Sequence, residues 1–161
     1  MRDSYWKQHL SDNAQDEWTI SQQPGAEQIL RGHWDTWITE DDIQQIAAAG
    51  LTHLRIPIGY WAFEKYPGDD KYPADPFIQG QVEYLEKAIS WSRTHGLKII
   101  IDLHGVPGSQ NNWDHSGRVG KGILWPTHQP YIDFSVRIID QIAGNYTKPQ
   151  CEFRVYHPRQ A

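Results

Sequence analysis

The sequence lacks several features that would place it in a class at once. It has a single cysteine, Cys151, in 161 residues, so no internal disulfide can form. No apolar run approaches the ~20 residues that a membrane-spanning helix needs. The start at residues 1–4 is polar with no apolar region behind it, so no signal peptide is expected. Basic residues form no cluster and the net charge is -5, which argues against nucleic acid or a membrane as partner.

What is present predicts one globular domain. Hydrophobic residues make up 39% of the chain, with 8 Trp and 8 Tyr, which is ample for a core. The polar segment at 1–24 is expected to be a loop or a loosely attached helix. The elements expected after it are a short helix opening at Pro24 and Gly25, a helix capped by Thr39 and closed by Gly50, a strand at 52–58, a helix at 81–95, a strand at 97–104, and a helix stripe at 132–144 ending at Gly144.

The segment 97–114 is the most informative part of the chain. Three isoleucines lead into Asp102 and His104, and a loop rich in glycine, proline and amides follows. Such a run predicts a strand covered on both faces, as parallel sheets require. Ligands of these sheets bind beyond the carboxyl ends of the strands. Asp102 and His104 share parity, so they either point into one site or satisfy backbone groups under the loop.

Loop lengths indicate where a site would lie. The turns that enter the two strands are very short, whereas the connections 59–80 and 105–129 that leave them are long. Both long loops therefore lie at the carboxyl face, where (β/α) proteins build their sites.

Arg55 and Trp113 are the other unusual residues of this predicted face. An arginine within an apolar strand must pair with carboxylates or ligand oxygens, either as a structural ion pair or in a site. Trp113 lies among amides and acids in a polar loop. Aromatic rings beside polar groups suit a ligand with apolar faces and many hydroxyls, as sugars have.

Two other classes remain open from the residues alone. Asp102-x-His104 and Asp114-His115 have the spacing of metal ligands, as a metal hydrolase would use. A flavodoxin-like domain is the alternative fold, although the bulky residues at 59–61 do not suit a phosphate-binding loop.

Four motifs resemble fungal exo-β-1,3-glucanases of glycoside hydrolase family 5. They are HWDTWITE at 33–40, LRIPIGYWAF at 54–63, GQVEYLEKA at 80–88 and IDLHGVPGSQN at 101–111, and the likeness runs from about 26 to 146. The resemblance implies a (β/α)8 barrel that trims glucose from β-1,3-glucan by a retaining mechanism. It also implies an extracellular or cell-wall location, a monomer, and neither metal nor cofactor.

The resemblance further implies supporting roles for four residues. Arg55 resembles the arginine that supports the nucleophilic carboxylate, and His104 resembles a histidine near the sugar subsite. Trp113 falls where relatives carry an aromatic residue at the mouth of the pocket, commonly Phe. Asp114 is a candidate acceptor for a sugar hydroxyl.

The catalytic glutamates of that family have no counterpart here. The acid/base belongs to an Asn-Glu-Pro motif after the fourth strand, and this motif is absent after Tyr146. A full barrel takes ~250 residues. We therefore expect an α/β fold that is a truncated (β/α)8 barrel, comprising strands two and three with their helices over 25–146, with 147–161 as an irregular tail. We expect no catalytic residue in the chain and no hydrolysis by it alone; the alternative is a non-catalytic β-glucan-binding protein.

Overall fold

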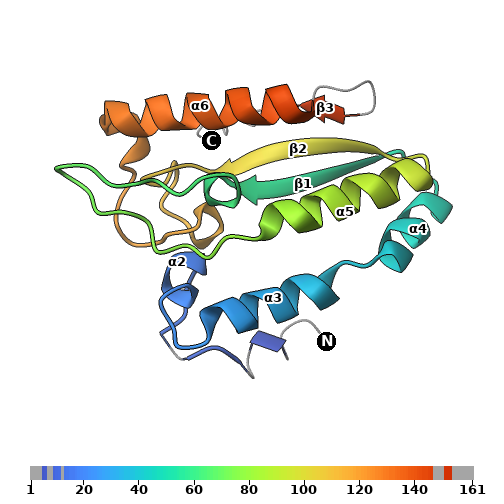
Figure 1. The fold of residues 1–161 in the computed structure, drawn as a ribbon, viewed down its shortest axis with the longest axis horizontal. Coiled ribbons are helices and arrows are strands. Elements are labelled where there is room, and N and C mark those ends of the chain that lie inside the picture. Colours follow the sequence, from blue (N-terminus) through green and yellow to red (C-terminus); the bar gives the residue numbers. More distant parts are fainter. Residues whose placement is uncertain (1–4, 7–8, 12, 147–150, 154–161) are drawn as a thin grey trace.

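The fold is built on a three-stranded parallel sheet, seen in a computed structural model that describes residues 5–6, 9–11, 13–146 and 151–153 (Figure 1). The strands are β1 (His53–Gly59), β2 (Lys98–Gly105) and β3 (Cys151–Phe153), in the order β1-β2-β3. β2 is central: its Lys98 lies opposite His53 of β1, and its Ile99 lies opposite Cys151 of β3. The predicted parallel α/β arrangement is confirmed.

Helices flank this sheet. They are α2 (Glu17–Ile20), α3 (Ala26–Trp37), α4 (Glu40–Ala48), α5 (Gln81–Thr94) and α6 (Gln129–Tyr146), with short 3-10 turns η1 (Tyr60–Ala62), η2 (Asp114–Ser116) and η3 (Trp125–Thr127). α5 and α6 run beside β1 and β2 in Figure 1, and their buried Leu85 and Ile138 join one core with Ile99 and Ile101 of β2. None of the helices among the described residues is long and apolar enough to cross a membrane.

The predicted helix ends are largely confirmed. α4 begins with a capping box in which Thr39 and Asp42 exchange hydrogen bonds. Gly50 and Gly96 stand after α4 and α5 with φ of 85° and 73°, a conformation that glycine adopts without strain. The expected end of the last helix at Gly144 is wrong, because α6 continues to Tyr146. The hydroxyl of the buried Tyr146 donates to Glu86 Oε1 at 2.7 Å, so a contact with α5 carries the helix past the glycine.

Both end segments are joined to the fold more closely than expected. The polar segment expected at 1–24 contains α2, whose N-cap Asp16 is buried, and Trp18 packs edge-on against Phe77 at 5.3 Å. Part of this segment is thus joined to the core. In the tail expected to be irregular, Cys151–Phe153 pair with β2 as strand β3, while residues 147–150 and 154–161 lie outside the described residues.

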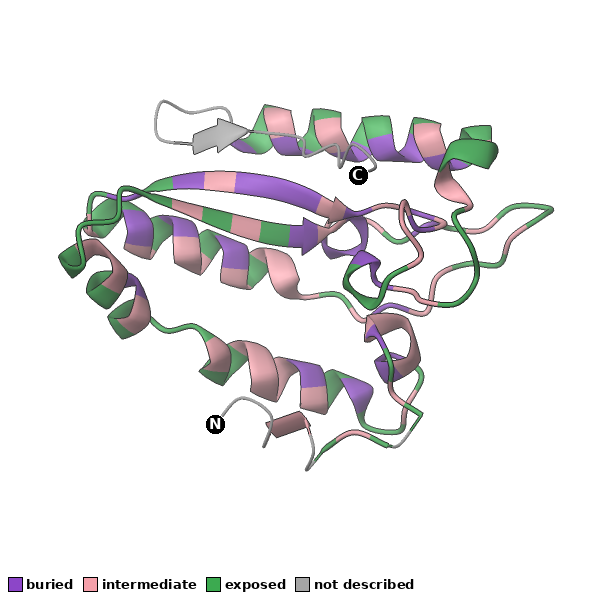
Figure 2. Ribbon diagram, turned by 180° about the vertical axis from the view of Figure 1, so that it is seen from behind, coloured by how far each residue is buried: buried purple, intermediate pink, exposed green. Residues whose placement is uncertain are grey.

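Burial differs sharply between the two long strands (Figure 2). Most of β2 is buried, whereas β1 alternates between exposed and half-buried residues until Ile58. Among the described residues β1 has β2 as its only strand partner, so its other edge is free.

Candidate functional site

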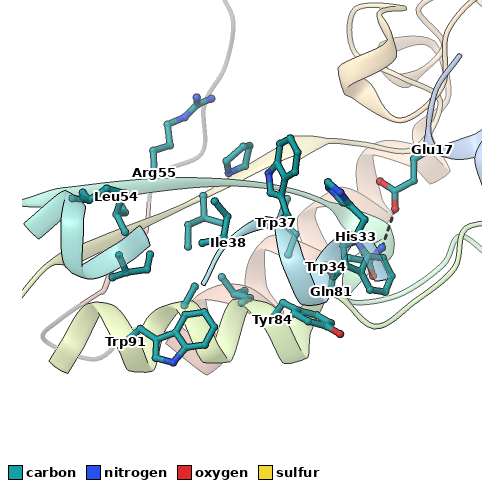
Figure 3. Close-up of a pocket in the computed structure, with 18 of the residues that line it drawn as sticks. Glu17, His33, Trp34, Trp37, Ile38, Leu54, Arg55, Gln81, Tyr84 and Trp91 are labelled. Carbon is teal, nitrogen blue, oxygen red and sulfur yellow. Dashed lines mark hydrogen bonds between the residues drawn. The ribbon is translucent and has the colours of Figure 1, made fainter. Parts of the chain in front are cut away.

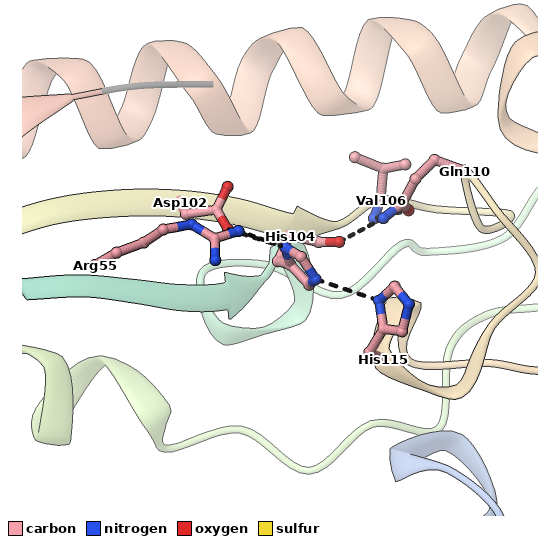
Figure 4. A network of polar contacts seen from close by, with 6 residues as sticks. All are labelled: Arg55, Asp102, His104, Val106, Gln110 and His115. Carbon is pink, nitrogen blue, oxygen red and sulfur yellow. Dashed lines mark hydrogen bonds and ion pairs between the residues drawn. The ribbon is translucent and has the colours of Figure 1, made fainter. Parts of the chain in front are cut away.

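Polar side chains from β1 and β2 meet toward the carboxyl end of the sheet (Figure 4). Asp102 is 1% exposed, and its Oδ2 lies 2.5 Å from Arg55 Nη2 and 2.9 Å from His104 Nδ1. A buried carboxylate requires such partners, because desolvation of an unpaired charge is costly. The structure therefore brings together Arg55, Asp102 and His104, as the parity of the predicted strand indicated for the latter two.

The donors in this network fix the state of the His104 ring. Arg55 can only donate and an ionised Asp102 can only accept. Because the Nδ1 atom of His104 lies nearer to Asp102 (2.9 Å) than to Arg55 (3.3 Å), we assign the ring proton to Nδ1, so that Nδ1–H donates a hydrogen bond to Asp102. In a neutral His104 the other nitrogen, Nε2, is then an acceptor that faces away from the sheet.

The loop after β2 is held to the strand by its own amide side chains. Gln110 Nε2 donates to the carbonyl oxygen of His104, and Gln110 Oε1 accepts from the Val106 backbone at 3.3 Å. Ser109 Oγ accepts from the Asn112 backbone at 2.7 Å, and both residues have φ near 60°. These bonds fix the path of the loop before η2.

Trp113 and Asp114 lie on this loop beside the network. Trp113 is 64% exposed, so it is free of the core, as its polar neighbours predicted. Asp114 opens η2, is exposed, and its Oδ1 accepts from the His115 backbone at 2.9 Å. Among the bonds recorded for the described residues, none joins either side chain to Arg55 or His104, but His115 of the same turn lies 3.2 Å from His104 Nε2.

Sequence reasoning missed the role of Trp61 at this end of the sheet. Its ring is buried where a Cβ on Gly59, Gly105 or Gly117 would stand 2.3, 2.6 or 2.4 Å away. The ring therefore fits only because these three positions are glycine. The signal in the sequence was a glycine at the end of each long strand, Gly59 in β1 and Gly105 in β2. Gly59 stands two residues before Trp61 itself.

Glu17 was also missed, because it lies in the segment expected to be loose. Its Oε1 accepts from Trp61 Nε1 and from Gln81 Nε2, both at 2.9 Å. Burial raises the pKa of this carboxyl, while the two hydrogen bonds act in the opposite direction. Glu17 thus fastens α2 to the turn that leaves β1.

A second carboxyl organises the long loop after β1. Asp75 Oδ2 accepts from the Tyr60 hydroxyl and from the Tyr66 backbone, the latter at 3.0 Å. Burial raises the pKa of Asp75 to about 6. The loop also reaches the start of α6, where Asp69 Oδ2 accepts from His128 Nε2 at 2.5 Å.

A mainly apolar cavity lies elsewhere, along the free edge of β1 (Figure 3). We call it the edge groove; it has a volume of about 500 Å³ and lies between α3, α4, β1 and α5. Its walls include Trp34, Trp37, Leu54, Ile56 and Trp91, and Glu17 and Gln81 close one end. Arg55 borders the groove while its guanidinium turns to Asp102.

The residues spaced like metal ligands in the sequence, Asp102, His104, Asp114 and His115, do not form a metal-binding cluster in the structure. Within the described ranges no three His, Cys, Asp or Glu side chains are grouped as a metal site would need. Both contacts of Asp102, to Arg55 and His104, are made by Oδ2, and its Oδ1 is buried without a hydrogen-bond partner among the described residues.

A family model and two curated relatives match most of this chain. The family model Cellulase (glycosyl hydrolase family 5) matches residues 13–151. The chain is 56% identical over 117 residues to the probable glucan 1,3-beta-glucosidase A of Aspergillus terreus, covering 71% of this chain and 26% of the relative. It is 46% identical over 139 residues to the glucan 1,3-beta-glucosidase of Pichia angusta, covering 84% of this chain and 30% of the relative.

Solved structures show the same fold. The rutinosidase from Aspergillus niger superposes with a TM-score of 0.80 at 26% identity, over 95% of this chain and 42% of that chain. The structure of AoRut also gives 0.80, at 28% identity and the same coverage. The chain thus spans less than half of these structures, and about a quarter to a third of the two curated relatives.

Proposed function

Because the chain belongs to glycoside hydrolase family 5, the cellulase family, we propose that it forms the glucose-holding part of an exo-acting β-1,3-glucan hydrolase. The observation that carries this proposal is the Arg55–Asp102–His104 network toward the carboxyl end of the sheet, with an exposed Trp113 beside it. In (β/α)8 enzymes this face bears the site. The curated relatives named as glucan 1,3-beta-glucosidases supply the substrate class.

Each proposed site residue has a chemical role suited to a sugar. His104 Nε2 accepts a hydrogen bond from a hydroxyl, since Asp102 fixes the proton on Nδ1. Trp113 offers a flat apolar face to the axial C–H groups of a glucose ring. The Asp114 carboxylate accepts from one or two hydroxyls in charge-assisted hydrogen bonds. Arg55 donates to Asp102 and so orients that carboxylate behind His104.

Hydrolysis itself needs groups that these residues do not supply. A retaining glycosidase uses two carboxyls about 5 Å apart, one as nucleophile and one as acid/base. Asp102 cannot serve, because it is 1% exposed and engaged by Arg55 and His104. We infer that the 161-residue chain binds glucan without cleaving it, and that the catalytic carboxylates belong to the part of the relatives that it does not match. On the strength of the same relationship we also propose an extracellular or cell-wall location and a monomeric state.

The test separates binding from hydrolysis. The purified chain is incubated with insoluble β-1,3-glucan and with laminarin, and the bound protein and the released glucose are measured. We expect retention on the glucan, at least a fivefold loss of retention in Trp113→Ala, and no glucose release. Trp91→Ala, in the edge groove, is the matched control and should be retained as well as the unsubstituted chain. Glucose release would overturn the binding-only inference, and equal retention of Trp113→Ala would remove the assigned subsite.

A second candidate ligand comes from the solved structures. Both matches at a TM-score of 0.80 cover 95% of the chain, and one is named a rutinosidase. If the subsite prefers such a disaccharide, free rutinose should displace the chain from glucan at a lower concentration than laminaribiose does. We expect the opposite order, because identity to the glucosidases is higher, at 46% and 56%.

A further inference from the structure

The outer nitrogen of His104 is not open in this structure, because His115 covers it. His115 Nδ1 lies 3.2 Å from His104 Nε2, and the two ring centroids are 5.2 Å apart at an angle of 40° (Figure 4). With the His104 proton on Nδ1, its Nε2 accepts, so His115 Nδ1–H is the donor. The lone pair proposed for a sugar hydroxyl is therefore already in use.

We propose that His115 is a built-in competitor for the sugar: it caps His104 in the free protein and is displaced when a glucan hydroxyl takes its place. This inference rests on the proposed function, since it concerns the same subsite. It assigns to η2 a role as a gate that regulates access to His104.

The setting of His115 allows such a displacement. His104 cannot turn away, because Asp102 holds its Nδ1 at 2.9 Å and Arg55 holds Asp102. His115 is exposed, and in the described part of the chain its ring has no recorded hydrogen bond other than that to His104. Because the His104 ring is held by Asp102 and the exposed His115 ring is not held in this way, the bond opens by movement of His115.

The chemistry of the exchange is nearly balanced. A hydroxyl and an imidazole N–H are both single donors to the same acceptor, so binding replaces one hydrogen bond with another. The cap therefore lowers affinity by about one net hydrogen bond, which corresponds to a factor of roughly 3 to 10. The charged groups around the pair are Asp102 and Arg55 behind His104, and Asp114 beside His115.

The alternative is that His115 contacts the sugar itself. Removal of His115 would then weaken binding, whereas removal of a competitor strengthens it. The sign of the change in affinity separates the two roles.

The first measurement tests the cap without any ligand. Long-range ¹H–¹⁵N spectra of the histidine rings report which nitrogen carries the proton and whether a bare nitrogen accepts a hydrogen bond. In His115→Ala we expect the Nε2 resonance of His104 to move toward that of a free acceptor, with the proton still on Nδ1. An unmoved Nε2 resonance would show that the cap does not exist in solution and would overturn the proposal.

The second measurement is the affinity for laminaritriose by calorimetry. His115→Ala should bind about threefold to tenfold more tightly, and His104→Ala should lose binding. His53→Ala is the matched control, an exposed histidine at the amino end of β1 that contacts Thr52, and its affinity should be unchanged. His115→Leu, whose side chain has no hydrogen-bond donor at the position of Nδ1, replaces the alanine variant if thermal unfolding shows that the latter is not folded.

The outcomes distinguish this inference from the function on which it rests. Equal or weaker binding by His115→Ala, with binding by the unsubstituted chain, overturns the gate and leaves the proposed function standing. If no variant binds laminaritriose, the proposed function falls and the gate falls with it, whatever the ring spectra show.

Discussion

The carboxyl end of the sheet and the free edge of β1 share one strand but differ in how their side chains are paired. At the carboxyl end the Arg55 guanidinium, Asp102 and His104 bond to one another. Along the edge groove Leu54 and Ile56 of the same strand are only half-buried. The carboxyl end is thus assembled by residues of this chain, whereas the edge presents apolar surface that parallel sheets normally cover.

The backbone shows that this edge can accept another strand. Lys98 N–H donates to the Thr52 carbonyl at 3.0 Å, so the even-numbered residues of β1 turn their polar backbone groups to β2. The odd-numbered residues, including Arg55 and Pro57, turn the polar groups of their backbone toward the free edge, along which the groove runs. In a closed barrel each strand has two neighbours. Pro57 has no N–H to offer, so a neighbour there would bond mainly to the backbone of Arg55 and to the Pro57 carbonyl.

Asp102→Ala should disrupt the polar network at the carboxyl end and produce the largest loss of stability among the polar substitutions. It removes the shared acceptor, leaving Arg55 and His104 without their buried partner. We expect a loss of about 2 to 3 kcal/mol in the free energy of unfolding, reduced from the cost of a fully buried pair because Arg55 is half exposed. Urea unfolding followed by circular dichroism measures it. Asp102→Asn keeps one acceptor for His104 and should lose less; an equal loss would show that charge alone matters.

Asp75 tests how the long loop is fastened at the same end. Its pKa is raised from 3.8 to about 6 by burial, so the folded chain holds this proton more tightly than the unfolded chain. Between those two values the unfolded state has already lost the proton, and stability therefore falls as the pH rises from about 4 to 6. This fall in the free energy of unfolding amounts to at most about 2 kcal/mol, after allowance for the partial exposure of Asp75.

The variant Asp75→Asn isolates that contribution. An amide oxygen can still accept from Tyr60 and from the Tyr66 backbone, but it does not titrate in this range. Unfolding free energies from urea titrations at pH 4, 5, 6 and 7 should show a flatter profile for the variant than for the unsubstituted chain. Parallel profiles would mean that Asp75 ionises at its ordinary pKa in the folded state.

The sequence predicted the polar residues at the carboxyl end of the sheet better than it predicted the contacts that hold this end together. Parity placed Asp102 and His104 together, and polar neighbours kept Trp113 out of the core, because both rules are local. Glu17 and Trp61 could not be paired in advance, since 44 residues separate them and the space for the indole ring depends on three glycines from different segments. A contact between distant segments leaves no periodicity in the sequence.

The smallest expected effect lies at the edge, where Ile56 and Ile101 form a matched pair. They are register partners on neighbouring strands, but Ile101 is 1% exposed whereas Ile56 is half-buried beside the groove. Truncation of a buried isoleucine to alanine costs about 2 to 5 kcal/mol, through lost burial and the cavity left behind. At Ile56 solvent and the open groove already occupy part of that space, so Ile56→Ala should cost about 1 kcal/mol, and Ile101→Ala should fall within the full range. Equal losses in urea unfolding would mean that the groove is closed in solution and that the edge of β1 is covered.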